Sequence, residues 1–158
     1  MLAARAVSPV VGIVLLVALT LTVSSVVAVG AFDLATATEP AEPTRASFAA
    51  TADASTGRIT LTHRGGRAVD VDDLRVVVTV DGEELAHQPP VPFFSARGFV
   101  SGTTGPFNPA ADQRWTAGET ASFVVAGTNA PTVDRGSVVV VTLVVDGGVA
   151  GEIRVLAG

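Results

Sequence analysis

Residues 6–32 read AVSPVVGIVLLVALTLTVSSVVAVGAF, an uncharged run that lies between Arg5 and Asp33. A helix needs about 20 apolar residues to cross a membrane, so this run is long enough for one span. Ser8 can cap the first free backbone N–H groups, and Pro9 suits the first turn because its missing N–H costs nothing there. The VVGIVLLV segment after Pro9 is apolar on every side. We therefore predict a helix covered all round, by lipid or by other apolar helices.

Three interpretations of this run remain open. A cleaved secretory signal has a short basic start, an apolar stretch and a small-residue cleavage site, for which Ala28-Val29-Gly30 could serve. The apolar run is long and uniform for such a signal. A plain N-terminal membrane anchor fits the length. The third interpretation is a class III signal peptide, in which a very short basic leader is cut on the cytoplasmic side and the helix is kept.

The motif around Arg5 favours the third interpretation. Residues 5–12 read RAVSPVVG and are followed by IVLLVALT, which resembles the N-terminal motif of archaeal type IV pilins, especially haloarchaeal ones. The resemblance implies cleavage by the archaeal prepilin peptidase between Ala6 and Val7. A positive charge holds the leader inside, and a proline keeps the preceding residue extended for the peptidase. The residues assigned to processing in this way are Arg5, Ala6, Val7, Ser8 and Pro9.

The same resemblance implies that the helix leaves the membrane and packs with copies of itself in a filament core. Small and hydroxylated residues let helices approach closely and form hydrogen bonds. The alternative is that such residues are merely tolerated in a lone span. Val11 stands where bacterial pilins carry a glutamate, so a contact from that glutamate to a neighbour's N-terminus is not available. The predicted packing residues are Gly12, Ala18, Thr20, Thr22, Ser24, Ser25, Ala28 and Gly30.

Four regions follow along the chain: a leader at 1–6, a hydrophobic helix at 7–34, a linker at 35–45 and an ectodomain at 46–158. The linker contains two prolines and no large apolar residue, which is typical of a spacer. The ectodomain alternates strand-like and turn-like segments, with a hairpin turn signal at Asp81-Gly82 and a loop expected at Ser101–Gln113. The expected strands are Ala46–Ala52, Arg58–His63, Leu74–Val80, Glu83–His87, Phe93–Val100, Ala121–Ala126, Ser137–Val145 and around Glu152–Leu156.

This pattern predicts an all-β sandwich of immunoglobulin-like form, because two sheets can bury their apolar faces against each other. Ser137–Val145 reads as a central strand buried on both faces. The segments LTHRGG at 61–66 and WTAGE at 115–119 are similar to haloarchaeal pilin ectodomains. Arg67 departs from that pattern, where an acid is expected.

Composition excludes several kinds of chemistry. The chain has 158 residues, no cysteine and two histidines, which excludes disulfides, thiol nucleophiles and Cys-ligated zinc. All ten basic residues are arginine and the net charge is −5, which argues against nonspecific nucleic-acid binding and suggests a halophilic host. The acid groups at 70–73 and 81–84 lack calcium-loop spacing, so a solvated face is expected there rather than a weak cation site. We expect His63 to make a structural hydrogen bond, His87 to be exposed and Trp115 to fill the core.

The sequence thus predicts a structural pilin subunit, with no enzymatic activity, metal or cofactor. The resemblance implies four partners: copies of the chain, prepilin peptidase, an assembly platform with its ATPase, and the membrane before assembly. It also implies a cell-surface filament used for adhesion. The alternative is a membrane-anchored β domain that binds a ligand and does not polymerise.

Overall fold

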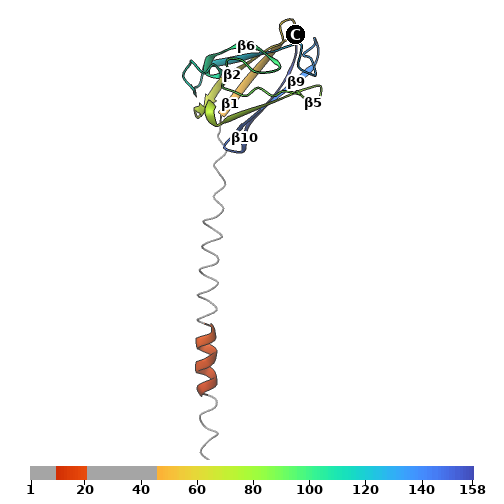
Figure 1. The fold of residues 1–158 in the computed structure, drawn as a ribbon. Helices are drawn as coiled ribbons and strands as arrows, with labels where there is room; N and C mark the ends of the chain where they lie inside the picture. Colours follow the sequence, from red (N-terminus) through yellow and green to blue (C-terminus); the bar gives the residue numbers. More distant parts are fainter. Residues whose placement is uncertain (1–9, 21–45) are drawn as a thin grey trace, which may run out of the picture. The chain divides into compact units, whose positions relative to one another are not determined.

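The computed structural model describes residues 10–20 and 46–158. The chain divides into two units, Met1–Pro40 and Ala41–Gly158, each of which is described by itself. In the first unit, residues 10–20 form an α-helix (Figure 1). This segment belongs to the predicted helix at 7–34. The rest of that helix, the leader at 1–6 and the linker at 35–45 lie outside the described residues.

The second unit is built from short strands, two 3₁₀ turns and loops (Figure 1). Its elements follow the chain in this order: β1 (Ala46–Asp53), β2 (Arg58–Gly66), β3 (Val69–Asp70), η1 (Val71–Asp73), β4 (Leu74–Val80), β5 (Glu83–Glu84), β6 (Phe99–Thr104), η2 (Gly105–Phe107), β7 (Arg114–Trp115), β8 (Thr120–Val125), β9 (Val138–Val145) and β10 (Gly148–Leu156).

The strands form two four-stranded sheets, with the orders β1-β2-β8-β6 and β10-β9-β4-β5, and β3 pairs with β7. Every pairing within these sheets is antiparallel. The C-terminus links the two large sheets, because Ala157 forms a parallel bridge with Ala52 of β1. The Gly158 N–H also donates to the Ala52 carbonyl at 3.1 Å.

One hydrophobic core lies between the two large sheets. Alternate residues of β4 are buried, as a strand with a single core-facing side requires. Buried side chains from β2 and β8 belong to the same cluster as those from β4 and β9. Fully burying each such side chain contributes roughly 1.5–3 kcal/mol relative to exposure. The largest side chains buried in this cluster are Trp115, Phe107, Phe123, Ile59, Leu61 and Leu143.

Several predicted strands are confirmed with small shifts at their ends. Leu74–Val80 is strand β4, and the following turn contains Asp81 and Gly82 at φ values of 52° and 88°. These positive angles are those of a type I′ turn, and the pairing of Val80 with Glu83 confirms the hairpin predicted at Asp81-Gly82. The prediction that β9 is buried on both faces is wrong. Only its alternate residues are buried, and those on the other side are half-buried, because β9 faces the core cluster with one side only, through Val139, Val141 and Leu143.

The strand predicted at Glu83–His87 is wrong beyond Glu84, and a side chain explains why. The Val78 N–H donates to Gln88 Oε1 at 2.7 Å, and Gln88 Nε2 donates to the Val78 carbonyl at 3.0 Å. The Gln88 side-chain oxygen therefore takes the Val78 N–H that the Leu85 carbonyl would bind in a longer returning strand, while the Val78 carbonyl still accepts from the Leu85 N–H at 3.1 Å.

The strand predicted at Phe93–Val100 also lies elsewhere. Strand β6 begins at Phe99 and extends to Thr104, into the segment predicted as loop. The preceding backbone is held outside the ladder, because the Phe93 N–H donates to the Phe107 carbonyl at 2.9 Å. The two-residue strands β3 and β7 were not predicted, because they are too short to show any periodicity.

The last strand is longer than predicted. It begins at Gly148, after a turn in which Asp146 and Gly147 have φ values of 51° and 78°. The ladder with β9 is irregular between Val149 and Gly151 and regular from there to Leu156. An extra residue in one strand hides the alternation near its start, which explains the short prediction.

Candidate functional site

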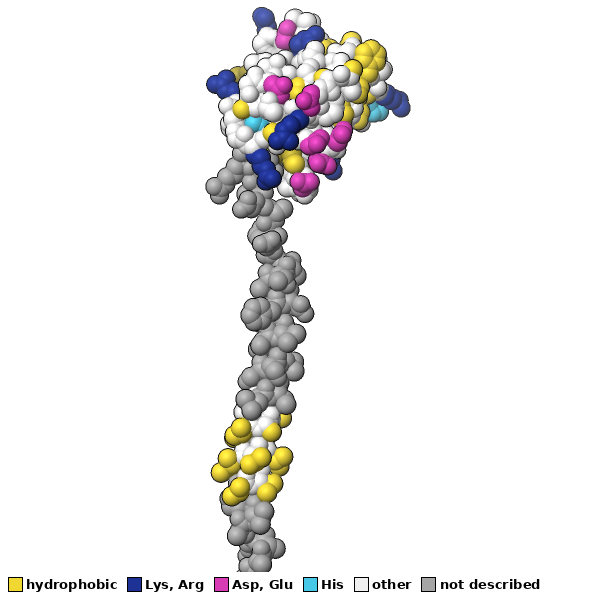
Figure 2. All heavy atoms as spheres, turned by 90° about the vertical axis from the view of Figure 1, so that its left-hand side faces the viewer, with side chains coloured by type: hydrophobic (Ala, Val, Ile, Leu, Met, Phe, Trp, Pro, Cys, Tyr) yellow, Lys and Arg dark blue, Asp and Glu magenta, His cyan; other side chains and the backbone are white. Residues whose placement is uncertain are grey.

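The described helix exposes its apolar side chains on all sides. The exposed fractions of its large apolar residues run from 47% at Val11 to 65% at Leu15 and Leu16. Figure 2 shows hydrophobic side chains along the described helix and charged ones on the β unit. A helix with an apolar surface all round requires an apolar environment. Among helices built only from described residues, none combines the length and hydropathy that a membrane span requires.

Three of the predicted packing residues lie in this helix: Gly12, Ala18 and Thr20. They occupy three different sides, because successive helical residues are about 100° apart. No atom lies within 4 Å of the position a Cβ would take at Gly12, so its side of the helix is open. The Thr20 hydroxyl donates to the Val17 carbonyl at 2.8 Å. Predicted residues outside the described part of the chain are Arg5, Ala6, Val7, Ser8, Pro9, Thr22, Ser24, Ser25, Ala28 and Gly30.

The acid groups of the β unit hold backbone turns. Asp70 Oδ1 accepts a hydrogen bond from the Asp72 N–H at 3.1 Å and so caps η1. Asp81 Oδ1 accepts from the Val138 N–H at 2.8 Å, which ties the β4–β5 turn to β9. Within residues 10–20 and 46–158, no group of three or more acidic or histidine side chains could hold a metal ion.

Asp53 has a similar role in the β1–β2 turn. Its Oδ1 atom accepts hydrogen bonds from the Ser55 hydroxyl at 2.6 Å and the Ser55 N–H at 2.8 Å. These bonds lower the pKa of the exposed Asp53 carboxyl below its usual value. The carboxylate therefore stays ionised at neutral pH and keeps its turn in place.

The two segments singled out in the ectodomain meet in space around Trp115. Trp115 and His63 are fully buried, with ring centroids 5.9 Å apart. Phe48 of β1 packs against both rings, at 4.9 Å from His63 and 5.1 Å from Trp115. Phe107 closes the cluster at 5.2 Å from Trp115. We call these four residues the Trp115 cluster. It confirms the prediction that Trp115 fills the core.

His63 makes the structural hydrogen bond that was predicted. Its Nε2 atom donates to the Arg67 carbonyl at 3.0 Å. Its buried Nδ1 atom has no hydrogen-bond partner within the described residues. The other histidine differs from expectation. His87 is half-buried rather than exposed, because its backbone carbonyl and N–H are both bound by the buried Asn129 side chain.

Glu119 connects the Trp115 cluster to β2. Its carbonyl accepts from Trp115 Nε1 and from the His63 N–H, both at 3.0 Å. Its carboxylate accepts from the Thr116 N–H at 2.7 Å and the Thr116 hydroxyl at 2.8 Å. The WTAGE segment is thus a closed turn that fixes one edge of the cluster.

We expect Glu119→Ala to lower the free energy of unfolding by about 1 kcal/mol, because the Thr116 N–H and hydroxyl lose their acceptor. Glu119→Gln keeps an acceptor oxygen at the same distance and should lose less. Urea unfolding of the full chain in detergent, followed by circular dichroism, measures both changes. Equal stability of the alanine variant and the unmodified chain would contradict this role.

Residues 5–48 match the family model described as "Archaeal Type IV pilin, N-terminal". The chain carries an archaeal type IV pilin N-terminal region. The match begins at Arg5 and ends at Phe48, so it includes the described helix and the first residue of the Trp115 cluster. No curated protein shows significant similarity to the chain.

The matched N-terminal region points to a class of protein at a coarse level. The family is structural and non-enzymatic, which agrees with the prediction made from the sequence. Archaeal type IV pilins are in general membrane or cell-surface proteins that self-assemble with the help of a processing machinery.

Proposed function

We propose that this pilin-region chain is a subunit of an extracellular type IV filament. The carrying observation is the match over residues 5–48, which spans the whole processing motif and the described helix. The prepilin peptidase would cut between Ala6 and Val7. Arg5 would hold the leader at the cytoplasmic side, and Ser8 and Pro9 would keep the cut bond ahead of the helix in extended backbone.

The exposed apolar helix supports a role in assembly. In the precursor, lipid would cover the side chains that are 47–65% exposed in the described segment. After extraction, sister helices would take the place of lipid. Each square ångström of apolar surface kept from water in this way is worth about 25 cal/mol. Close approach would occur at the small and hydroxylated residues: Gly12, Ala18, Thr20, Thr22, Ser24, Ser25, Ala28 and Gly30.

The β unit would be an immunoglobulin-like sandwich that coats the filament. Its strand orders support this, since β1-β2-β8-β6 corresponds to A-B-E-D and β10-β9-β4 to G-F-C of the immunoglobulin arrangement. The ectodomain would span residues 46–158, after a linker at 35–45. With 15 acidic residues in the chain and all ten basic residues arginine, its coat would be hydrated and negatively charged. That coat would mediate surface adhesion.

The partners follow from this role. The precursor would sit in the cell membrane with its leader inside, and the peptidase would meet it there. An assembly platform and its ATPase would extract the helix and stack it on copies of itself. The mature protein would then lie at the cell surface.

The N-terminal residue of the protein in filaments sheared from cells tests this proposal. We expect intact-mass analysis to give a start at Val7. Ala6→Leu puts a bulky side chain beside the cut bond and should leave most of the protein as uncut precursor. Leu2→Ala, outside the motif, is the matched control and should be processed normally.

Two other results would overturn the proposal. A start near Ala31 would mean ordinary secretory cleavage and a released β domain. A start at Met1 with no sheared filaments would support the alternative, a membrane-anchored binding domain that does not polymerise.

A further inference from the structure

Phe94 is the only exposed aromatic side chain in the part of the chain that the structure describes, with an exposed fraction of 61%. Its backbone is fixed on both sides. The Phe94 carbonyl accepts from the Gly102 N–H at 2.8 Å, and the N–H of the buried Phe93 donates to the Phe107 carbonyl at 2.9 Å. The Thr103 hydroxyl also donates to the Phe93 carbonyl. A ring held on such a backbone loses little conformational freedom when a partner covers it.

The surroundings of Phe94 in the chain are positively charged. No acidic residue lies between Glu84 and Asp112, and Arg97 is the only arginine in that stretch. Arg97 is exposed and forms no ion pair with any residue that the structure describes. An aromatic anchor beside an arginine is the composition of residues that dominate protein–protein contacts. We call Phe94 and Arg97 together the Phe94 projection.

The outer face of the other sheet contains a hollow of about 500 Å³. Its lining includes Val138 and Val140 of β9 and Thr79 of β4, which point away from the core. Leu156 pairs with Val138 and is 69% exposed, so it extends the apolar surface at one end. Sites that enclose small molecules start at roughly 300 Å³, so this hollow has room for a phenyl ring. We call it the β9 hollow.

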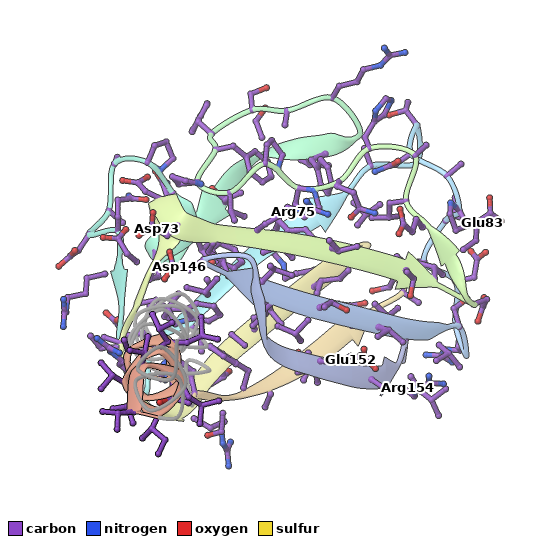
Figure 3. The ribbon with its side chains drawn as sticks, turned by 90° about the horizontal axis from the view of Figure 1, so that it is seen from below. Asp73, Arg75, Glu83, Asp146, Glu152 and Arg154 are labelled. Carbon is purple, nitrogen blue, oxygen red and sulfur yellow. The ribbon has the colours of Figure 1, made fainter. Side chains whose placement is uncertain are left out.

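The rim of the β9 hollow is acidic. Asp81 and Glu152 line it, together with Arg154. Glu84 pairs with Thr79, and residues directly opposite in a ladder share a face, so Glu84 adds another carboxylate beside the hollow. Figure 3 shows Glu152 and Arg154 together on β10. Carboxylates therefore outnumber the single guanidinium, and the rim complements the positive Phe94 projection.

We propose that Phe94 of one copy of this chain inserts into the β9 hollow of a second copy, with Arg97 against the acidic rim. One copy cannot fill its own hollow, because Phe94 is held on β6 and the hollow lies on the sheet that does not contain β6. The contact joins two different surfaces, so each copy keeps a projection or a hollow for a further copy. Contacts of this heterologous kind continue into open chains or close into rings.

This inference rests on the proposed filament role for its setting, where it supplies a contact between the ectodomains of neighbouring subunits. The experiments below use the full chain in detergent. The contact can therefore fail while cleavage between Ala6 and Val7 and filament formation succeed, and the reverse outcome is equally measurable.

A second depression of the β unit suits an aromatic ring less well. It has about 270 Å³ and lies between the β1–β2 turn and the loop before β9. Its lining includes Ser55, Thr56, Thr132 and Asp134, and the Thr132 hydroxyl already donates to Asp134 Oδ2 at 2.9 Å. A ring placed there would remove water from polar groups that it cannot satisfy.

Cysteine cross-linking tests the contact, because the chain has no cysteine of its own. Full-length Ser95→Cys and Thr79→Cys chains, carrying different tags, are mixed and treated with a short bismaleimide. Ser95 is exposed next to Phe94, and Thr79 lines the β9 hollow. We expect the mixed dimer to exceed either single-variant dimer several-fold, because the contact joins one surface to the other.

The matched control position is Thr51→Cys, which is exposed on β1 in the other sheet. Mixed with either Ser95→Cys or Thr79→Cys, it should give only the yield of random collision. Equal yields from all combinations would overturn the proposal.

Placing a substitution in one of the two chains separates the contact from misfolding. Phe94→Ala in the Ser95→Cys chain should lower the mixed yield about tenfold, since it removes the anchor. The same substitution in the Thr79→Cys chain should leave the yield unchanged, because that chain supplies the hollow. Val149→Ala removes another apolar side chain, 62% exposed, and should have no effect in either chain. Equal losses from Phe94→Ala in the two chains, or no loss in either, would overturn the proposal.

Charge reversal should show the opposite asymmetry. Glu152→Arg turns an acidic rim position basic, so it should lower the yield only in the Thr79→Cys chain. Arg97→Glu should lower it only in the Ser95→Cys chain. Equal effects of either reversal in both chains would contradict the assignment of the two surfaces.

A chain that carries both Ser95→Cys and Thr79→Cys tests whether the contact propagates. We expect a ladder of dimers, trimers and larger products on a denaturing gel, because every copy offers both surfaces. Products that stop at the dimer would indicate a closed two-fold contact and would overturn the heterologous arrangement.

Discussion

Replacing Trp115 by alanine is expected to lower the free energy of unfolding by about 3–5 kcal/mol, the usual cost of emptying a buried aromatic site. Trp115 is fully buried and stacks with Phe48, Phe107 and His63 at 5.1, 5.2 and 5.9 Å. Its indole N–H also satisfies the Glu119 carbonyl at 3.0 Å. The full chain in detergent is unfolded with urea and followed by far-ultraviolet circular dichroism, because the variant lacks the only tryptophan.

Trp115→Phe is the matched control. It keeps an aromatic ring in the cluster and loses the indole hydrogen bond and part of the volume, so its stability should lie between those of the alanine variant and the unmodified chain. A loss below about 1 kcal/mol for Trp115→Ala would show that the cluster does not hold the sheets together.

The second large effect is expected at Gly105, where η2 begins. Gly105 has a φ of 59°, and an added Cβ would lie 2.0 Å from the Thr120 carbonyl oxygen. That oxygen belongs to the backbone of β8, so relief requires a strand to move. We expect Gly105→Ala to lower the free energy of unfolding by about 2–5 kcal/mol, from the left-handed backbone and the clash together.

Gly102 separates the two causes. It has a φ of 95°, but no atom lies within 4 Å of the position its Cβ would take. Gly102→Ala should therefore cost only the backbone term, about 1–2 kcal/mol. If urea unfolding shows equal losses of unfolding free energy for Gly102→Ala and Gly105→Ala, the contact with Thr120 does not contribute to the destabilisation.

Local patterns were enough to predict much of this molecule. The observed strands Leu74–Val80 and Thr120–Val125 were predicted closely, because apolar residues alternate in the first and concentrate in the second, and an Asp-Gly or Gly-Glu pair marks the turn beside each. The pilin region was recognisable from Arg5 to Gly12 because its features lie at fixed spacing within a few residues. Such signals depend on neighbours in the chain alone.

The parts that were missed depend on side chains that replace backbone partners. Gln88 ends the β4–β5 ladder by binding the Val78 backbone, which no local pattern reveals. Asn129 is 2% exposed and its amide binds the backbone of His87, Ala130 and Gly98. The one local signal for these hydrogen bonds was an asparagine beside Ala-Pro in a loop. That signal does not show which distant backbone groups the amide binds.

The sequence determined an apolar N-terminal helix, its pilin motif and a β-rich domain, because hydrophobic period and charge placement are properties of contiguous residues. Tertiary structure decided which strands share a sheet, how His63 and Trp115 meet in the core, and that the C-terminus bridges to β1 through Ala157. These outcomes depend on register between segments far apart in the chain. Register is selected by the packing of all the strands together, and no single segment contains that information.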